Sequence, residues 1–242
     1  MENKLIIGNQ KMYMSANDIG EFLKNTTGKI NSSNVVICPS ALYIPYFLKH
    51  RYSVGIQNVC FASEGQYTGE ISAKQASDMG IKYGIVGHSE RRHYFNEDNE
   101  IINQKINNLL EQKIKVILCI GETSEEKNLL KTNKVLKSEI VSSLKKMKAE
   151  DFENIIIAYE PIWAIGTNRI PTMTEIKNNV QYIKDVINHI FKCDVKVIYG
   201  GSVNSANIEK LNKIDNLDGF LVGGASTKYE EFLKIIEVVV NQ

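Results

Sequence analysis

Short apolar runs recur along the whole chain, and longer stretches with helical spacing of apolar residues separate them. The runs lie at 5–8, 35–38, 54–57, 83–87, 115–120, 154–159, 195–200 and 219–224. Apolar residues within each run are continuous rather than alternating, which is typical of strands covered on both faces in a parallel sheet. The runs start about 20 to 40 residues apart, which leaves room for one strand and one crossover helix in each unit.

Two of the intervening stretches have an apolar helical face. The first is formed by Ile101, Ile102, Ile106, Leu109 and Leu110, and the second by Leu129, Leu136, Ile140, Leu144 and Met147. Two further helix starts are predicted from capping boxes, in which a Thr and a Glu three residues later satisfy each other's backbone N–H groups. These pairs are Thr172 with Glu175 and Thr227 with Glu230.

Eight predicted strands that alternate with helices indicate an α/β protein, and no low-complexity linker divides the chain. We therefore expect one domain over residues 1–242, folded as a (β/α)8 barrel with eight parallel strands. A doubly wound open sheet is the alternative, but the first run is not followed by the GxGxxG motif of that architecture. In a barrel, functional side chains are expected just past the C-terminal ends of the strands.

The charge balance argues against a general binder of nucleic acid or of anionic membranes. The 242 residues include 29 basic and 28 acidic side chains, for a net charge of +1. The chain start has too short an apolar run for a signal peptide, and 18 consecutive apolar residues occur nowhere. A local site for one small anion remains compatible with this composition.

The four cysteines are Cys38, Cys60, Cys119 and Cys193, and none belongs to a CxxC pair. Their scatter indicates neither a zinc site nor a dithiol redox motif. Reduced thiols fit a reducing compartment, so we expect a cytoplasmic protein.

A carboxylate, Glu160, follows directly after the run at 154–159. Pro161, Trp163 and Gly166 come next, in the sequence YEPIWAIGT. This arrangement suits a fixed base followed by a stiff loop that closes over a site. Taken alone, the same pattern would also fit a surface turn with a buried tryptophan.

Polar side chains follow two other runs. Asn9 and Lys11 come after the first run and can both donate hydrogen bonds to an oxygen that gains negative charge. His88 comes after the fourth run, where Ser89 and Glu90 are expected to begin a short helix. The positive end of that helix would favour a neutral imidazole. Each pattern alone would also fit an ordinary loop or a structural histidine.

Paired glycines end the last two runs, at Gly200–Gly201 and at Gly223–Gly224. Such pairs let backbone N–H groups approach an oxyanion, and the loops after the seventh and eighth strands of a barrel often bind phosphate. The chain lacks a GxSxG nucleophile motif and a cluster of metal ligands, and we expect no cofactor and no metal. A base with electrophiles suits proton transfer next to the carbonyl of a small phosphorylated substrate.

The ordered set of short motifs resembles the triosephosphate isomerase family over essentially the whole chain. The set comprises NQK at 9–11, QNV at 57–59, YTGE at 67–70, GHSERR at 87–92, CIGET at 119–123, YEPIWAIGT at 159–167, YGGSV at 199–203 and VGGAS at 222–226. The resemblance implies a homodimeric aldose–ketose isomerase of glycolysis and gluconeogenesis. It would interconvert dihydroxyacetone phosphate and D-glyceraldehyde 3-phosphate through an enediolate, without a cofactor.

The resemblance also implies a role for each matching catalytic residue. Glu160 would be the base that moves the proton between adjacent carbons, and His88 would be the neutral electrophile at the substrate oxygens. Lys11 would supply positive charge to the enediolate, Asn9 would bind the substrate and help to orient the enediolate, and Glu90 would pair with Lys11.

The phosphate site and its surroundings follow by the same resemblance. Gly166, Ser202, Gly223 and Gly224 would bind the phosphate. Residues 161–171 would form a lid that keeps water from the intermediate. Ser89, Cys119, Tyr199, Trp163 and Pro171 would support the site or its lid. Thr68 and Glu70 would belong to a dimer loop, with Thr68 reaching into the partner's site.

The chain departs from the family pattern at two places. Gln10 stands where the family usually has Trp, which we expect to matter little because neighbours at a strand end point to opposite faces. Pro171 has no N–H, so it cannot form the lid bond that the family makes between this backbone position and the tyrosine equivalent to Tyr199. Our hypothesis is a different latch, from the Asn168 N–H to Ser202, with a stiffer hinge.

Two other functions stay open from the sequence. An isomerase of the same fold could act on a longer ketose phosphate, such as a tetrulose phosphate, with the same acid–base groups. A catalytically dead relative could serve as a binding protein, although the joint presence of Glu160, His88 and Lys11 argues against it.

Overall fold

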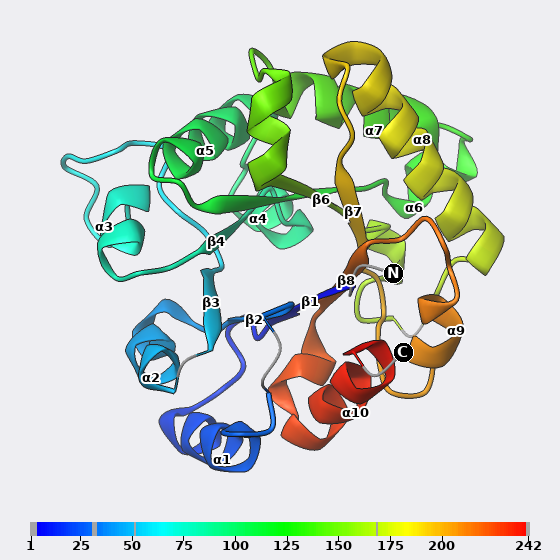
Figure 1. Cartoon of the computed structure of the whole chain (residues 1–242). Helices are drawn as coiled ribbons and strands as arrows, with labels where there is room; N and C mark the ends of the chain where they lie inside the picture. The colour runs from blue at the N-terminus through cyan, green and yellow to red at the C-terminus, as the bar shows by residue number, and fades with distance from the viewer. Residues whose placement is uncertain (1–3, 31–32, 51, 168, 241–242) are drawn as a thin grey trace.

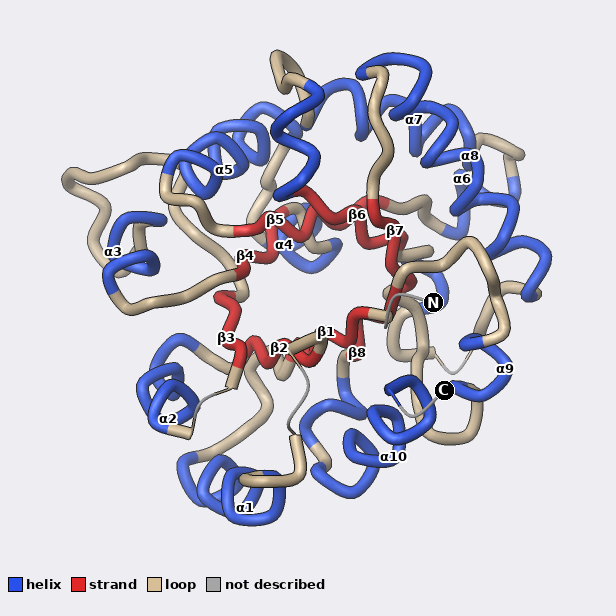
Figure 2. Tube along the Cα trace, viewed as in Figure 1, coloured by secondary structure: helices blue, strands red, loops and turns tan. Residues whose placement is uncertain are grey.

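The computed structural model describes residues 4–30, 33–50, 52–167 and 169–240. Eight parallel strands form a closed barrel in chain order, and the helices surround it (Figures 1 and 2). The strands are β1 (Leu5–Asn9), β2 (Val35–Cys38), β3 (Ser53–Ile56), β4 (Tyr83–Val86), β5 (Lys115–Ile120), β6 (Ile155–Tyr159), β7 (Lys196–Tyr199) and β8 (Gly219–Val222). The prediction of a (β/α)8 barrel is therefore confirmed, and each predicted strand end lies within two residues of the observed one.

The helices include ten α-helices and four short 3-10 turns in the described part of the chain. The α-helices are α1 (Ala16–Thr26), α2 (Ile44–Lys49), α3 (Ala73–Asp78), α4 (Ser89–Tyr94), α5 (Asn99–Glu111), α6 (Ser124–Asn128), α7 (Thr132–Ser143), α8 (Met173–Phe191), α9 (Ile208–Asn212) and α10 (Tyr229–Val240). The 3-10 turns are η1 (Ala41–Tyr43), η2 (Ala149–Asn154), η3 (Ile162–Ala164) and η4 (Gly224–Thr227).

Pairing of the first strand with the last closes the sheet. Ile7 lies opposite Val36 of β2 on one side and Leu221 of β8 on the other. An open sheet has two edge strands, whereas each of the eight strands described here pairs with two neighbours, so the closed sheet excludes the doubly wound alternative. Closure also sets the end of β1 beside the end of β8.

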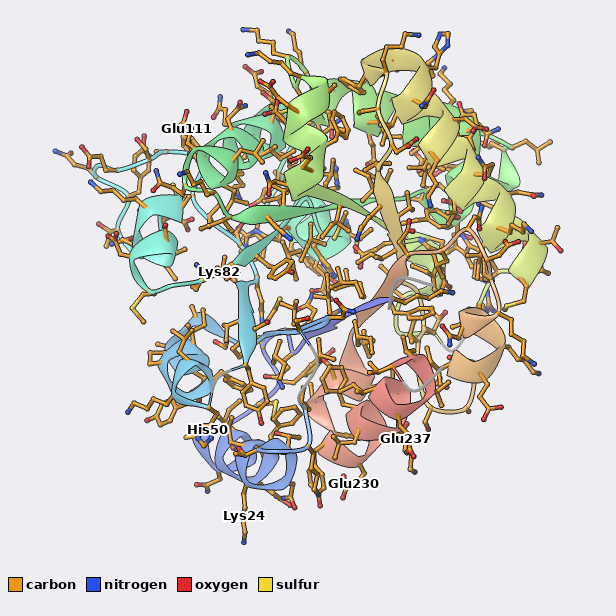
Figure 3. All side chains as sticks on the ribbon, in the orientation of Figure 1. Lys24, His50, Lys82, Glu111, Glu230 and Glu237 are labelled. Carbon is orange, nitrogen blue, oxygen red and sulfur yellow. The ribbon has the colours of Figure 1, made fainter. Side chains whose placement is uncertain are left out.

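Residues along each strand alternate between two apolar cores. The barrel interior is filled by Ile7, Val36, Cys38, Ile85, Ile117, Cys119, Ile156, Ala158, Ile198 and Leu221. Their chain neighbours, such as Ile6, Leu118 and Ile157, pack outward against the helices. Both faces are buried, which explains why the runs are continuously apolar. Charged side chains, among them Lys24, Glu111 and Glu237, lie on the outside of the helix ring (Figure 3).

One predicted capping box is confirmed and the other is wrong. Thr172 and Glu175 exchange the expected hydrogen bonds at the start of α8. Thr227 instead ends the turn η4, and its hydroxyl donates to the carbonyl of Gly224 at 2.8 Å. Since Thr227 is already used by this turn, it does not cap α10 through Glu230.

The second predicted helical face is wrong at its first residue. The short helix α6 ends at Asn128, and Leu130 then takes a left-handed φ of 55° before α7 begins. This break turns Leu129 toward solvent, where it is 53% exposed. Leu136 and Ile140 are buried on α7, as predicted. Leu144 and Met147 are also buried, but they follow the end of α7 at Ser143 and so do not belong to its helical face.

No helix in the described ranges is long and apolar enough to cross a membrane.

A buried ion pair lies under the apolar face of α5, where the sequence pattern gave no sign of it. The Lys105 ammonium contacts the Glu97 carboxylate and also donates to Asn58 Oδ1 at 2.7 Å. Arg91 Nε donates to the same carboxylate at 2.6 Å. Burial lowers the pKa of Lys105, while the hydrogen bond and charge of Glu97 act to raise it. This network fixes the loop after β3 to the segment after β4.

Removal of Glu97 should therefore destabilise the fold. In Glu97→Ala the Lys105 ammonium, 2% exposed, loses its carboxylate partner. We expect the free energy of unfolding to fall by about 3–5 kcal/mol in urea denaturation. Glu111→Ala, at an exposed site at the end of α5, is the control and should change it by less than about 0.5 kcal/mol. Equal stability of the two variants would contradict this view of the ion pair.

Candidate active site

One pocket of about 230 Å³ opens at the C-terminal ends of the strands. Its walls include the eight residues that were predicted to contact substrate. They are Asn9, Lys11, His88, Glu160, Gly166, Ser202, Gly223 and Gly224. These residues come from the ends of β1, β4, β6, β7 and β8 and from the loop after β6, so barrel closure brings them together.

Glu160 directly follows β6, and its backbone N–H donates to the Ile120 carbonyl at 2.8 Å. The alternation along β6 points its side chain into the barrel mouth, where the residue is 3% exposed. One carboxylate oxygen lies 3.4 Å from His88 Nε2. The other, Oε2, is buried and has no hydrogen-bond partner within the described chain. A buried carboxylate with a free oxygen at a pocket can accept a proton from a bound molecule.

Glycines make room for Glu160, both for its side chain and for its backbone carbonyl. A Cβ on Gly200 would lie 2.6 Å from Cγ of Glu160, and a Cβ on Gly121 would lie 1.8 Å from the Glu160 carbonyl oxygen. Both contacts are far closer than atoms tolerate. Gly200 of the YGG motif therefore leaves space for the Glu160 carboxylate. The sequence predicted Gly200 only as part of an anion-binding turn, so this role was missed.

His88 is the N-cap of α4, and its ring orientation follows from the start of that helix. The backbone N–H of Glu90 donates to His88 Nδ1 at 3.3 Å. Because Nδ1 accepts this bond, Nε2 is the ring nitrogen that can donate, and it faces Glu160 and the pocket. The bond to the backbone therefore fixes the orientation of the ring.

Lys11 takes a left-handed backbone conformation with φ of 51°. Asn9 Oδ1 accepts from its N–H at 3.1 Å, and Gln57 Nε2 donates to its carbonyl at 2.9 Å. Its ammonium contacts Glu90 Oε1 at 2.5 Å. Glu90 thus contacts both Lys11 and, through its backbone, His88. Gln57 lies in the QNV motif, and its role could not be read from that motif alone.

The opposite side of the pocket is formed by the turns after β7 and β8. A Cβ on Gly223 would lie 3.6 Å from Cε of Lys11, and one on Gly224 would meet nothing within 4 Å. The backbone of this turn is thus open to a ligand. The 3-10 turn η4 directly follows β8, and the α-helix after β7, α9, has five residues.

Two further predicted residues lie behind the pocket. Cys119 points into the barrel, and burial followed by the charge of Glu160 raises the pKa of its thiol well above the ordinary value. The thiol therefore stays protonated beside the carboxylate. Ser89 is buried as the first residue of α4. No group of three or more His, Cys, Asp or Glu side chains that could hold a metal occurs among the described residues.

Comparison with known proteins decides the family. The sequence model of the family described as "Triosephosphate isomerase" matches residues 4–239. The chain is 38% identical over 246 residues to the triosephosphate isomerase of Alkaliphilus oremlandii, covering 98% of this chain and 99% of the relative. It is also 43% identical over 212 residues to that of Coprinopsis cinerea, covering 85% and 84% of the two chains. The chain belongs to the triosephosphate isomerase family.

Members of the triosephosphate isomerase family are isomerases of the intramolecular oxidoreductase class, and this chain has their TIM-barrel fold. The predictions of the family, the fold and the enzyme class are confirmed. The roles of the individual site residues stay predictions.

Residues 161–171 were predicted to form a lid, and the first half of this segment makes several contacts with the barrel. Trp163 Nε1 donates to Glu122 Oε1 at 2.9 Å, and Lys127 Nζ lies 3.7 Å from the indole ring centroid. Ser202 Oγ donates to the Ala164 carbonyl at 2.7 Å. Burial raises the pKa of Glu122, and the hydrogen bond from Trp163 opposes this rise. Glu122 lies in the CIGET motif, but its contact with the lid was not predicted.

The second half of the lid carries the departure from the family. Pro171 is buried just before the N-cap of α8. The Tyr199 hydroxyl is buried and has no hydrogen-bond partner among the residues that the structure describes. Burial, with the charge of Glu122, raises the pKa of Tyr199, so this hydroxyl keeps its proton. Asn168, the donor in our latch hypothesis, lies outside the described residues.

The predicted dimer loop is exposed. Thr68 and Glu70 belong to the segment after β3, which projects from the barrel beside α3 (Figure 1). Thr68 is thus accessible to a second chain.

The substitution Gly200→Ala tests whether Glu160 needs the space that Gly200 leaves open. In Gly200→Ala the added Cβ would displace the carboxylate, and a misplacement of about 1 Å typically lowers kcat by about 100-fold. Steady-state kinetics measure this loss, and thermal unfolding reports whether the variant is folded. Gly20→Ala, in an open position of α1, is the control and should keep full activity. Wild-type kcat in Gly200→Ala would contradict the steric role.

Proposed function

We propose that this chain interconverts dihydroxyacetone phosphate and D-glyceraldehyde 3-phosphate, with Glu160, His88 and Lys11 as the reacting groups. One observation carries the proposal. A carboxylate, an imidazole and an ammonium from distant parts of a triosephosphate isomerase family chain line one pocket with glycine-rich turns.

Proton transfer begins at the buried carboxylate. Glu160 takes a proton from the carbon next to the carbonyl of the ketose, which leaves an enediolate. The same carboxyl group returns the proton to the neighbouring carbon, while the hydroxyl proton of the first carbon passes to the oxygen of the former carbonyl, which yields the aldose. The space around Glu160 supports this role, because Gly200 lets the side chain lie in the pocket without steric contact.

Negative charge develops on the substrate oxygens during this transfer. His88 Nε2–H and the Lys11 ammonium both line the pocket and can donate to these oxygens. The bond from the Glu90 backbone N–H to Nδ1 orients the imidazole, and the Glu90 carboxylate holds the ammonium in place. Both electrophiles are therefore oriented before substrate binds.

The phosphate would bind at the far side of the pocket. Gly166, Ser202, Gly223 and Gly224 line this side, and the glycine backbones leave room for an anion. The lid over residues 161–171 would exclude water from the enediolate and suppress loss of phosphate.

We also propose a homodimer in the cytoplasm. Large exposed apolar residues lie on the segments that follow β1, β3 and β4, which are close together in the barrel. They are Met12, Tyr13, Phe61, Tyr67, Tyr94 and Phe95. A second copy would cover these side chains, and Thr68 would then reach the partner's site. The cytoplasmic location rests on the four free cysteines.

The choice of substrate can be decided by a coupled assay with three-carbon and four-carbon ketose phosphates. We expect turnover of the triose phosphate, since the pocket of about 230 Å³ suits a small molecule. Preference for the tetrulose phosphate would favour the longer-substrate isomerase, and turnover of neither would favour a binding protein.

In Glu160→Gln, kcat should fall about 10²- to 10⁴-fold because the base is lost. Glu150→Gln, at an exposed site, is the control.

The lid hypothesis has its own test. If Pro171 weakens closure by removing an N–H donor, Pro171→Ala restores the donor that the family resemblance pairs with the tyrosine equivalent to Tyr199, whose hydroxyl has no partner among the described residues. We expect less phosphate elimination per turnover and a larger change in fluorescence on inhibitor binding. Trp163 is the only tryptophan of the chain, so this signal reports the lid. If the variant eliminates as much phosphate and closes no more readily, the hypothesis fails.

A further inference from the structure

Gln10 lies between Asn9 and Lys11, but its side chain points the other way. Asn9 and Lys11 line the pocket, whereas Gln10 is 1% exposed and directs its side chain away from the pocket, at the turn η4. This direction confirms the expected alternation. A fully buried amide nevertheless has to be explained, because its polar atoms lose their hydration.

The amide makes one identified hydrogen bond. Gln10 Nε2 donates to the carbonyl oxygen of Ser226 at 3.3 Å. That carbonyl can only accept, so the nitrogen of the amide has to face it. The other amide atom, Oε1, is buried without a partner in the described part of the chain. A buried apolar side chain would avoid this unpaired oxygen but would leave the Ser226 carbonyl without the Gln10 donor.

Ser226 belongs to the turn η4, which forms the phosphate side of the pocket. Its backbone N–H donates to the Gly223 carbonyl at 2.8 Å, and its hydroxyl donates to the same oxygen at 2.7 Å. Gly223 and Gly224 line the pocket. A continuous chain of hydrogen bonds thus runs from the segment that carries Lys11 to the turn that lines the pocket.

We propose that Gln10 is a positioning residue that holds the Lys11 ammonium and the anion-binding turn 223–226 at a fixed separation. The inference rests on the proposed function, because one substrate has to place its reacting oxygen at Lys11 and its phosphate at this turn. Gln57 and Asn9 fix the Lys11 backbone from the other side. Gln10 supplies the remaining link, across the β1–β8 closure.

Gln10→Met tests this role, since it keeps the length of the side chain and removes the donor. We expect inorganic phosphate to inhibit about three- to tenfold more weakly, with a rise in KM for triose phosphate of similar size. The fall in kcat should be smaller, since Glu160 and His88 do not contact Gln10.

Asn103→Leu is the matched control. Asn103 Nδ2 also donates to backbone carbonyls, of Ser143 at 2.8 Å and Lys145 at 3.0 Å, but it lies on α5 away from the pocket. This variant should lower the melting temperature and leave KM and phosphate inhibition unchanged.

Gln10→Glu supplies a second test with a different readout. A protonated carboxyl can donate to the Ser226 carbonyl, whereas a carboxylate cannot. Burial raises the pKa of a carboxyl group, so the deficit in phosphate affinity relative to wild type should shrink between about pH 8 and about pH 6. Gln10→Met cannot donate or ionise, so its deficit should not change over this pH range and serves as the reference.

The outcomes separate this inference from the proposed function. Folded Gln10→Met with wild-type KM and wild-type phosphate inhibition would overturn the positioning role, as would a pH-independent deficit in Gln10→Glu. If wild type does not isomerise triose phosphate, the proposed function fails. Weakened phosphate binding by Gln10→Met, measured by calorimetry on the same proteins, would still support the link between Gln10 and the turn.

Discussion

Closure of the barrel by the pairing of β1 with β8 is the constraint on which the site depends. It sets the first strand, which carries Asn9 and Lys11, beside the last strand, which ends in the glycine turn. The two-residue repeat of the strands then decides which side chains enter the mouth. Glu160 and Lys11 face inward, while Gln10 faces outward and bonds the neighbouring turn. Contacts between residues more than two hundred positions apart follow from this one pairing.

A second constraint is space at the mouth. The carboxylate of Glu160 occupies a position that any side chain at Gly200 would fill, and its backbone passes too close to Gly121 to allow a Cβ there. Glycine at these places has a steric purpose that is independent of backbone flexibility. The same barrel mouth uses glycine at 223 and 224 for another reason, to leave the backbone open to a ligand. The paired glycines after β7 and those after β8 thus have different physical roles.

The barrel of parallel strands could be predicted from the sequence, because strands buried on both faces give continuous apolar runs. The pocket residues were readable because polar side chains directly follow those runs. Contacts that depend on tertiary packing were not. Leu129 matched the helical period, but the left-handed residue Leu130 breaks the helix beyond it. Thr227 matched a cap, but a 3-10 turn already uses it. Lys105, buried against Glu97, has no signature in a hydrophobic pattern.

The proposed function requires Glu160, His88 and Lys11 to converge around one sugar-phosphate carbon. The most direct measurement is a crystal structure with a phosphorylated hydroxamate that mimics the enediolate. We expect the Glu160 carboxylate to lie over the two central atoms of the inhibitor. His88 Nε2 and Lys11 Nζ should contact the oxygens on these atoms, and the phosphate should lie on the backbone of Gly223 and Gly224. A ligand bound elsewhere, or with its phosphate toward Glu160, would contradict it.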